Sequence, residues 1–179
     1  MLKCIKCGGS FLTRGRIRLA DADICFKCYD SLGFDHKTGI YIGNTYRWDD
    51  IRDGQQALWA RQHAAIAAQE AAELGVSYKQ YKQLDQAGAT DMESKIFARI
   101  CAILADEERD HDLIDVSLGN NGSLLLMLDG VVFIRYKADA GVKWIIFENE
   151  SSEKIRIAGA GKLNSLAPRI VQAYDSATI

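Results

Sequence analysis

The segments Cys4-Ile-Lys-Cys7 and Cys25-Phe-Lys-Cys28 place two Cys-x-x-Cys pairs near the start of the chain, separated by residues 8–24. Two residues between thiolates let one tight turn present both sulfurs to a single ion, and two such turns complete a tetrahedron with no open position. The spacing therefore predicts a structural metal site, with one Zn²⁺ as the expected ion and Cys4, Cys7, Cys25 and Cys28 as its ligands. Disulfides, a redox-active pair and iron in place of zinc are the alternatives.

Composition indicates a globular chain in a reducing compartment. Of the 179 residues, 48% are apolar, which is ordinary for a core-forming protein. The longest apolar runs are far shorter than the roughly 20 residues of a membrane span. The opening MLKCIKCGGS turns polar at once, so no secretory signal is expected. We therefore expect a cytoplasmic location and no membrane partner, and in that setting paired cysteines are more often metal ligands than disulfides.

The charge is unevenly distributed although the net charge is only −2. Residues 1–47 carry +4, residues 48–110 carry −5, and residues 111–179 carry −1. Four thiolates around one divalent ion would lower the charge of the first segment further. Proteins that bind nucleic acid usually show a stronger basic footprint. The charge therefore disfavours that class.

Beyond the cysteine pairs, the patterning is first helical and then extended. Residues 51–74 are rich in Ala, Gln and Glu and predict one helix that tolerates Gly54 and stops at Gly75. A second helix is predicted over 77–86. A third begins after Thr90 or Asp91, where a stripe of apolar residues forms one face, and Cys101 beside that stripe is expected to be a core thiol. Asp129-Gly130 predicts a tight hairpin within a series of runs of strand length: 113–118, 123–128, 131–137, 142–148 and 153–158.

A closing helix is predicted from about Ser165, with Pro168 in its first turn. The elements together predict an α+β fold in three parts. A four-cysteine zinc ribbon with its exit loop covers 1–48, a helical segment covers 49–110, and an antiparallel sheet of about five strands with the closing helix covers 111–179.

Residues 4–34, CIKCGGSFLTRGRIRLADADICFKCYDSLGF, resemble the treble-clef or zinc-ribbon domains of unknown function that begin many short bacterial and phage proteins. In those domains a zinc knuckle is followed by a hairpin and by a second Cys-x-x-Cys at the start of a short helix. The resemblance implies zinc, a treble-clef-like fold and a phage or mobile-element setting. It implies no activity.

Residues 69–84 resemble a helix-turn-helix unit, with Gly75 at the turn and Ser77 as the helix cap. The resemblance implies an outward surface that meets phosphates through two lysines and base edges through two glutamines. That surface would consist of Tyr78, Lys79, Gln80, Lys82 and Gln83. The alternative is two helices joined at a glycine, which the acidic charge of this segment favours because phosphate contacts dominate affinity for DNA.

The sequence predicts a protein that is not an enzyme. His36, His63 and His111 are scattered, and Gly159-Ala160-Gly161-Lys162 lacks the full phosphate-loop spacing, so it is interpreted as a strand-to-helix turn. We expect a protein-binding adaptor or inhibitor, with an unidentified protein as the partner and DNA binding through 69–84 as the alternative. Three aromatic residues are candidate partner contacts, or else they pack the cysteine module onto the helices: Tyr41, Tyr46 and Trp48.

Overall fold

The computed structural model describes residues 2–11, 15–37, 45–139, 141–148 and 154–178. It confirms the α+β class, with clustered cysteines near the N-terminus and a five-stranded antiparallel sheet with a closing helix near the C-terminus. The chain forms two compact units, residues 1–66 and 67–179. The boundary between them falls inside helix α3, Gln55–Leu74, and thus within the segment 49–110 that the sequence grouped as one helical part.

The first unit is built from two small hairpins and short helices around a core of its own. Ile24, Tyr29 and Ile51 are almost completely buried in that core, together with Cys4. Because so few apolar residues are available here, a metal ion is a natural supplement to this core. The elements that precede α3 are β1 Leu2–Lys3 paired with β2 Ser10–Phe11, β3 Arg16–Arg18 paired with β4 Asp23–Cys25, α1 Phe26–Asp30 and α2 Trp48–Ile51.

The single helix predicted from Ile51 to Leu74 is wrong at its start, because Gly54 separates α2 from α3. Gly54 adopts a φ of +93°, and a Cβ there would lie 2.9 Å from the carbonyl oxygen of Leu32. The next amide, that of Gln55, donates to the same Leu32 oxygen at 2.8 Å. The chain turns here because only glycine accepts this conformation beside another backbone segment.

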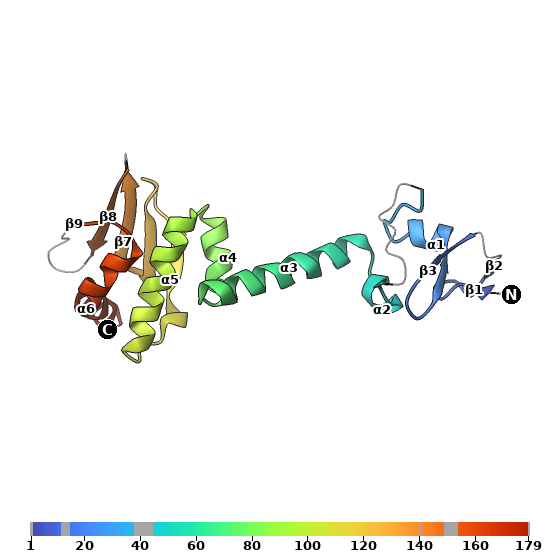
Figure 1. Cartoon of the computed structure of the whole chain (residues 1–179), viewed down its shortest axis with the longest axis horizontal. Coiled ribbons are helices and arrows are strands. Elements are labelled where there is room, and N and C mark those ends of the chain that lie inside the picture. The colour runs from blue at the N-terminus through green and yellow to red at the C-terminus, as the bar shows by residue number, and fades with distance from the viewer. Residues whose placement is uncertain (1, 12–14, 38–44, 140, 149–153, 179) are drawn as a thin grey trace. The chain divides into compact units, whose positions relative to one another are not determined.

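The second unit contains an antiparallel meander in which each strand pairs with the next (Figure 1). The strands are β5 Asp115–Leu118, β6 Leu124–Leu128, β7 Val131–Asp139, β8 Val142–Phe147 and β9 Lys154–Ile157. Asp129 and Gly130 join β6 to β7 with positive φ values of 48° and 83°, as the Asp-Gly pair predicts. Alternate residues of β6, namely Leu124, Leu126 and Leu128, are buried on one face of the sheet.

Helices cover that buried face and complete the core of the second unit. The predicted apolar stripe of helix α5, Asp91–Asp106, is confirmed, since Ile96, Ile100 and Leu104 have no exposed surface. Helix α6, Ala167–Ala177, drawn in red near the C-terminus in Figure 1, packs along β7 and buries Ile170. The elements are α4 Tyr78–Gln86, α5 Asp91–Asp106, η3 His111–Leu113, η4 Ala160–Leu166 and α6 Ala167–Ala177. None of the helices described here is long and apolar enough to cross a membrane.

Candidate functional site

The four predicted ligand cysteines converge on one place in the first unit. The sulfur atoms of Cys4, Cys7, Cys25 and Cys28 all lie within 4.8 Å of one another. Cys4 follows β1, Cys7 lies in the turn before β2, Cys25 ends β4, and Cys28 lies in α1. Their thiols are free, and the group is close enough for one metal ion to bind all four.

Backbone hydrogen bonds fold the first cysteine pair into a tight turn. The Gly8 amide donates to the Cys4 carbonyl at 2.8 Å, and the Cys4 amide donates to the Gly9 carbonyl at 3.0 Å. Gly8 has a φ of +69°, a value that glycine adopts without strain. The Cys25 amide donates to the Cys4 sulfur at 3.5 Å, so the second pair is tied directly to the first. The cluster therefore follows from local turns and one contact between the hairpins.

The electrostatics of the cluster favour a cation. Burial raises the pKa of the Cys4 thiol, but hydrogen bonds from the backbone at Cys25, Cys7 and Lys6 outweigh it and lower that pKa to about 6. Burial, together with hydrogen bonds to the other three sulfurs, raises the pKa of Cys28 to about 12. The surroundings therefore stabilise the thiolate form of Cys4 and disfavour ionisation of Cys28. A divalent ion would supply the positive charge that lets all four thiols ionise.

Cys101 does not belong to this cluster. It lies in α5 of the second unit with no exposed surface. Burial raises the pKa of its thiol to about 12. Cys101 is a core thiol, as predicted from its position beside the apolar stripe.

A histidine and two carboxylates form a second group in the first unit that the sequence did not indicate. Asp30, Asp35 and His36 bring their ligand atoms within 4.8 Å of one another. Asp30 accepts from the His36 ring nitrogen at 2.7 Å and from the His36 amide at 3.0 Å. The His36 ring stacks on Phe26 with centroids 4.4 Å apart. These contacts give His36 a structural role in holding the segment that follows α1.

The aromatic residues predicted as partner contacts fall into two groups. Tyr41 lies outside the described residues. Tyr46 and Trp48 are partly buried against the core of the first unit, and the Tyr46 hydroxyl accepts a hydrogen bond from Gln62 at 2.7 Å. This arrangement corresponds to the alternative in which these aromatic residues pack the cysteine module onto the helices.

Helix α3 exposes two large apolar side chains that the sequence analysis did not single out: Trp59, 44% accessible, and Ile66, 55% accessible. The sequence offered one signal for this exposure: Trp59 stands in an Ala-rich helix that has no apolar stripe against which it could be buried.

The surface predicted from the helix-turn-helix resemblance is largely used inside the second unit. The expectation that Gln80 faces outwards is wrong: its side chain is fully buried and donates to the backbone oxygens of His111 at 2.6 Å and Ile114 at 3.3 Å. Gln83 donates to the Asp115 carboxylate at 2.8 Å and accepts from the Val116 amide at 3.0 Å. Both glutamines therefore join α4 to the start of the sheet.

The two lysines of the same surface differ in their environment. The Lys79 ammonium forms an ion pair with Asp115 at 2.7 Å, and this pair helps to lower the pKa of that carboxyl. Lys82 is exposed and lies 5.8 Å from the centre of the Tyr78 ring. Of the five predicted residues, Tyr78 and Lys82 remain without a contact outside α4 among those described. Such a surface offers little for reading base edges.

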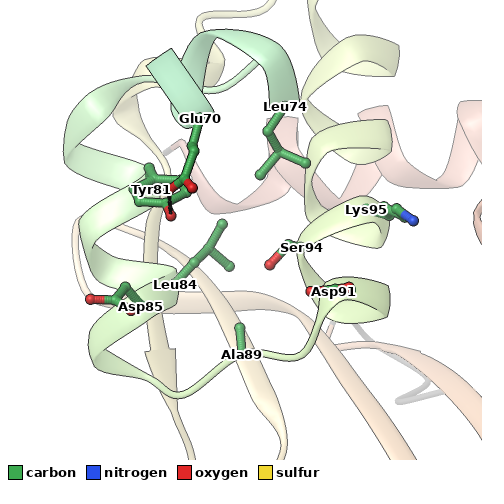
Figure 2. A pocket seen from close by; sticks show the side chains of 9 residues that line it. All are labelled: Glu70, Leu74, Tyr81, Leu84, Asp85, Ala89, Asp91, Ser94 and Lys95. Atoms are coloured by element: carbon green, nitrogen blue, oxygen red, sulfur yellow. Dashed lines mark hydrogen bonds between the residues drawn. The ribbon is translucent and has the colours of Figure 1, made fainter. Parts of the chain in front are cut away.

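A pocket of about 310 Å³ opens between α3, α4 and α5 in the second unit (Figure 2). Leu74 and Leu84 point towards its centre, and the Tyr81 hydroxyl donates to the Glu70 carboxylate at one side. The remaining lining residues are Asp85, Ala89, Asp91, Ser94 and Lys95. Three carboxylates against one ammonium make the rim acidic, so the pocket suits a cationic group with an apolar stem.

Comparison with models of protein families, with curated proteins and with solved structures finds no match to this chain. The functional assignment therefore rests on the geometry described above.

Proposed function

We propose that this chain is a zinc-stabilised, non-catalytic protein that binds another protein, as an adaptor or an inhibitor. The observation that carries the proposal is the convergence of the sulfurs of Cys4, Cys7, Cys25 and Cys28 within 4.8 Å. A set of four protein ligands leaves no open position for substrate or water, which is the pattern of a structural ion. We propose zinc because closed sites of four cysteines are its usual structural sites, and elemental analysis distinguishes it from iron, which four sulfur ligands also bind.

The acidic pocket supports the class of partner. Leu74 and Leu84 provide an apolar floor, and Glu70, Asp85 and Asp91 provide negative charge at the rim. A lysine or arginine side chain has an apolar stem and a cationic head that match these two features. We therefore propose a protein partner that inserts a basic side chain here. The alternative, DNA recognition through 69–84, gains no support from the buried amide of Gln80.

Metal content tests the first half of the proposal. The purified full chain is expected to hold one zinc per molecule by elemental analysis, whereas Cys25→Ser loses the ion and disorders residues 1–33. Cys101→Ser is the matched control, because its thiol lies in the other unit and its loss leaves the four ligands intact. In the Cys25→Ser variant the sheet of the second unit is expected to stay folded. A stoichiometric ion in Cys25→Ser would contradict the ligand set, and a charge-transfer spectrum of the purified protein would show iron instead.

Affinity capture tests the second half. Tagged full-length protein, treated with nuclease, is expected to retain a protein partner that is lost from the variant Asp85→Asn/Asp91→Asn. The matched control is Asp106→Asn/Glu107→Gln, which removes two exposed carboxylates at the other end of α5. Equal loss from both variants would show that overall charge, and not the pocket, governs binding. Loss on nuclease treatment alone would point to a nucleic acid bridge.

A further inference from the structure

The face of the sheet opposite the core carries a second surface in the second unit. In β8 the side chains alternate: Ile145 and Phe147 are fully buried, while Trp144 and Ile146 are partly exposed. The strand partners of Trp144 and Ile146 are Arg156 and Lys154 in β9. Because residues paired across a sheet share a face, an aromatic ring and an aliphatic side chain lie beside two cations.

This surface is strongly basic in its described part. Among the side chains described in 131–138, 142–147 and 154–157 that share the face of Trp144, none is a carboxylate, whereas four are cationic: Arg135, Lys137, Lys154 and Arg156. Lys143 alternates with Trp144 and belongs to the other side of β8, at the start of the strand. Arg135 is paired with Glu148 at 2.8 Å, just beyond the end of β8. Lys154 lies over the Trp144 ring, 4.5 Å from its centre. Lys143 and Arg156 form no ion pair with another described residue, so at these two positions the positive charge has no counterion among the described side chains.

A hollow of about 390 Å³ lies at one end of β8 and β9 and concentrates this charge. Lys143, Arg156 and Lys162 line it, together with Gly141, Val142, Ile157 and Ala158. Lys162 is the last residue of the Gly159-Ala160-Gly161-Lys162 segment, which turns from β9 into η4. Like charges gathered around one hollow repel each other, and an anion placed among them converts that repulsion into attraction. Arg156 lies on the edge strand β9 and belongs both to the hollow and to the face that carries Trp144, so the hollow adjoins that face at the edge of the sheet.

We propose that this basic face binds single-stranded nucleic acid, with backbone phosphate in the hollow and a base stacked on Trp144. This inference goes beyond the proposed function and does not depend on it. Unpaired bases expose the flat surface that an aromatic ring on a sheet can stack against, whereas the bases of a duplex are already stacked. A phosphopeptide would use the cations alone and leave the ring and Ile146 without a role. Lys154, which is exposed, would move from the ring to a phosphate as the base arrives.

Fluorescence anisotropy of a labelled, unstructured single strand of about 16 nucleotides tests the proposal with the full chain. Binding is expected to be tighter than to a duplex of the same length. It should weaken between about 50 and about 200 mM salt, with a logarithmic slope of about −2, since three phosphate contacts each contribute about −0.7. Lys143→Gln/Lys162→Gln is expected to lower the affinity about ten-fold at low salt and to make the slope shallower by about 1.4.

Two further variants make the result specific to this face. The matched control Lys82→Gln/Lys95→Gln removes two lysines of the same unit that lie on α4 and α5, and it should bind like the unaltered protein. Trp144→Val keeps a strand-forming residue but removes the ring, and it should weaken binding about five-fold or more without changing the salt slope. Circular dichroism confirms that each variant is folded.

Four outcomes of these binding measurements would overturn the proposal. They are no binding at low salt, equal affinity for single strand and duplex, an equal loss in the Lys82→Gln/Lys95→Gln control, and unchanged affinity in Trp144→Val. A phosphopeptide that competes as effectively as the single strand would assign the hollow to a different ligand and would also refute the proposal.

Discussion

Replacing Gln80 with Met tests how the second unit is held together, because it removes a buried amide while keeping the length of the side chain. In the structure the Gln80 amide donates to the oxygens of His111 at 2.6 Å and Ile114 at 3.3 Å. Its own oxygen accepts from the Ser77 amide at 3.1 Å at the start of α4. Ser77 is partly exposed, so water can replace its lost partner. Each of the two carbonyl groups loses a donor that comes from a side chain with no exposed surface, although the His111 carbonyl still accepts from the Ile114 amide at 3.2 Å.

The expected loss is about 2–3 kcal/mol in the free energy of unfolding, at about 1 kcal/mol for each lost bond and slightly less at the helix cap. For a unit of this size that corresponds to a fall of roughly 8–12 °C in the midpoint of thermal unfolding. Far-UV circular dichroism of the full chain measures it. Gln86→Met is the matched control, because Gln86 is exposed in the same helix and should change stability by less than about 0.5 kcal/mol.

A base-reading role for Gln80 predicts the opposite pattern. An outward-facing glutamine would tolerate Met with no loss of stability, and only DNA binding would change. If Gln80→Met and Gln86→Met unfold at the same temperature, the buried hydrogen bonds are not what joins α4 to the sheet, and the reasoning here is refuted.

Three further changes test other parts of the structure. Gly54→Ala should destabilise the first unit by about 2 kcal/mol in thermal unfolding, because its φ is +93° and the new Cβ would lie 2.9 Å from the Leu32 oxygen. Gly15→Ala is the control, because a Cβ added there would lie more than 4 Å from every heavy atom beyond its chain neighbours. Asp175→Asn should cost about 0.5 kcal/mol at pH 7, since hydrogen bonding to Arg109 lowers the pKa of Asp175. That cost should vanish as the pH falls below about 4 and through the lowered pKa, because the unfolded state then binds its proton first; a constant difference across that range would contradict the ion pair. With a thiol reagent, the four clustered cysteines should react after chelation of the proposed zinc ion, and Cys101 only after unfolding, because it is fully buried. Fast reaction of five thiols in the folded state would contradict its burial.

Sequence alone was sufficient wherever structure depends on neighbouring residues. The Cys-x-x-Cys spacing predicted the ligand cluster because each pair is presented by one short turn. The Asp129-Gly130 pair predicted the hairpin because both residues accept positive φ, and the apolar period of α5 predicted its buried face. In each case the pattern that supports the prediction spans only a few residues of the chain, although the two cysteine pairs meet through a contact between Cys4 and Cys25.

Tertiary structure decided the rest, because the deciding partners lie far away in the sequence. Gln80 is buried by backbone groups 31 and 34 residues later, which no helical pattern can reveal. Gly54 breaks a strongly helical segment because the backbone of Leu32 passes beside it. The acidic pocket and the basic hollow likewise arise where separate elements meet, so their charges, scattered along the sequence, become neighbours only after folding.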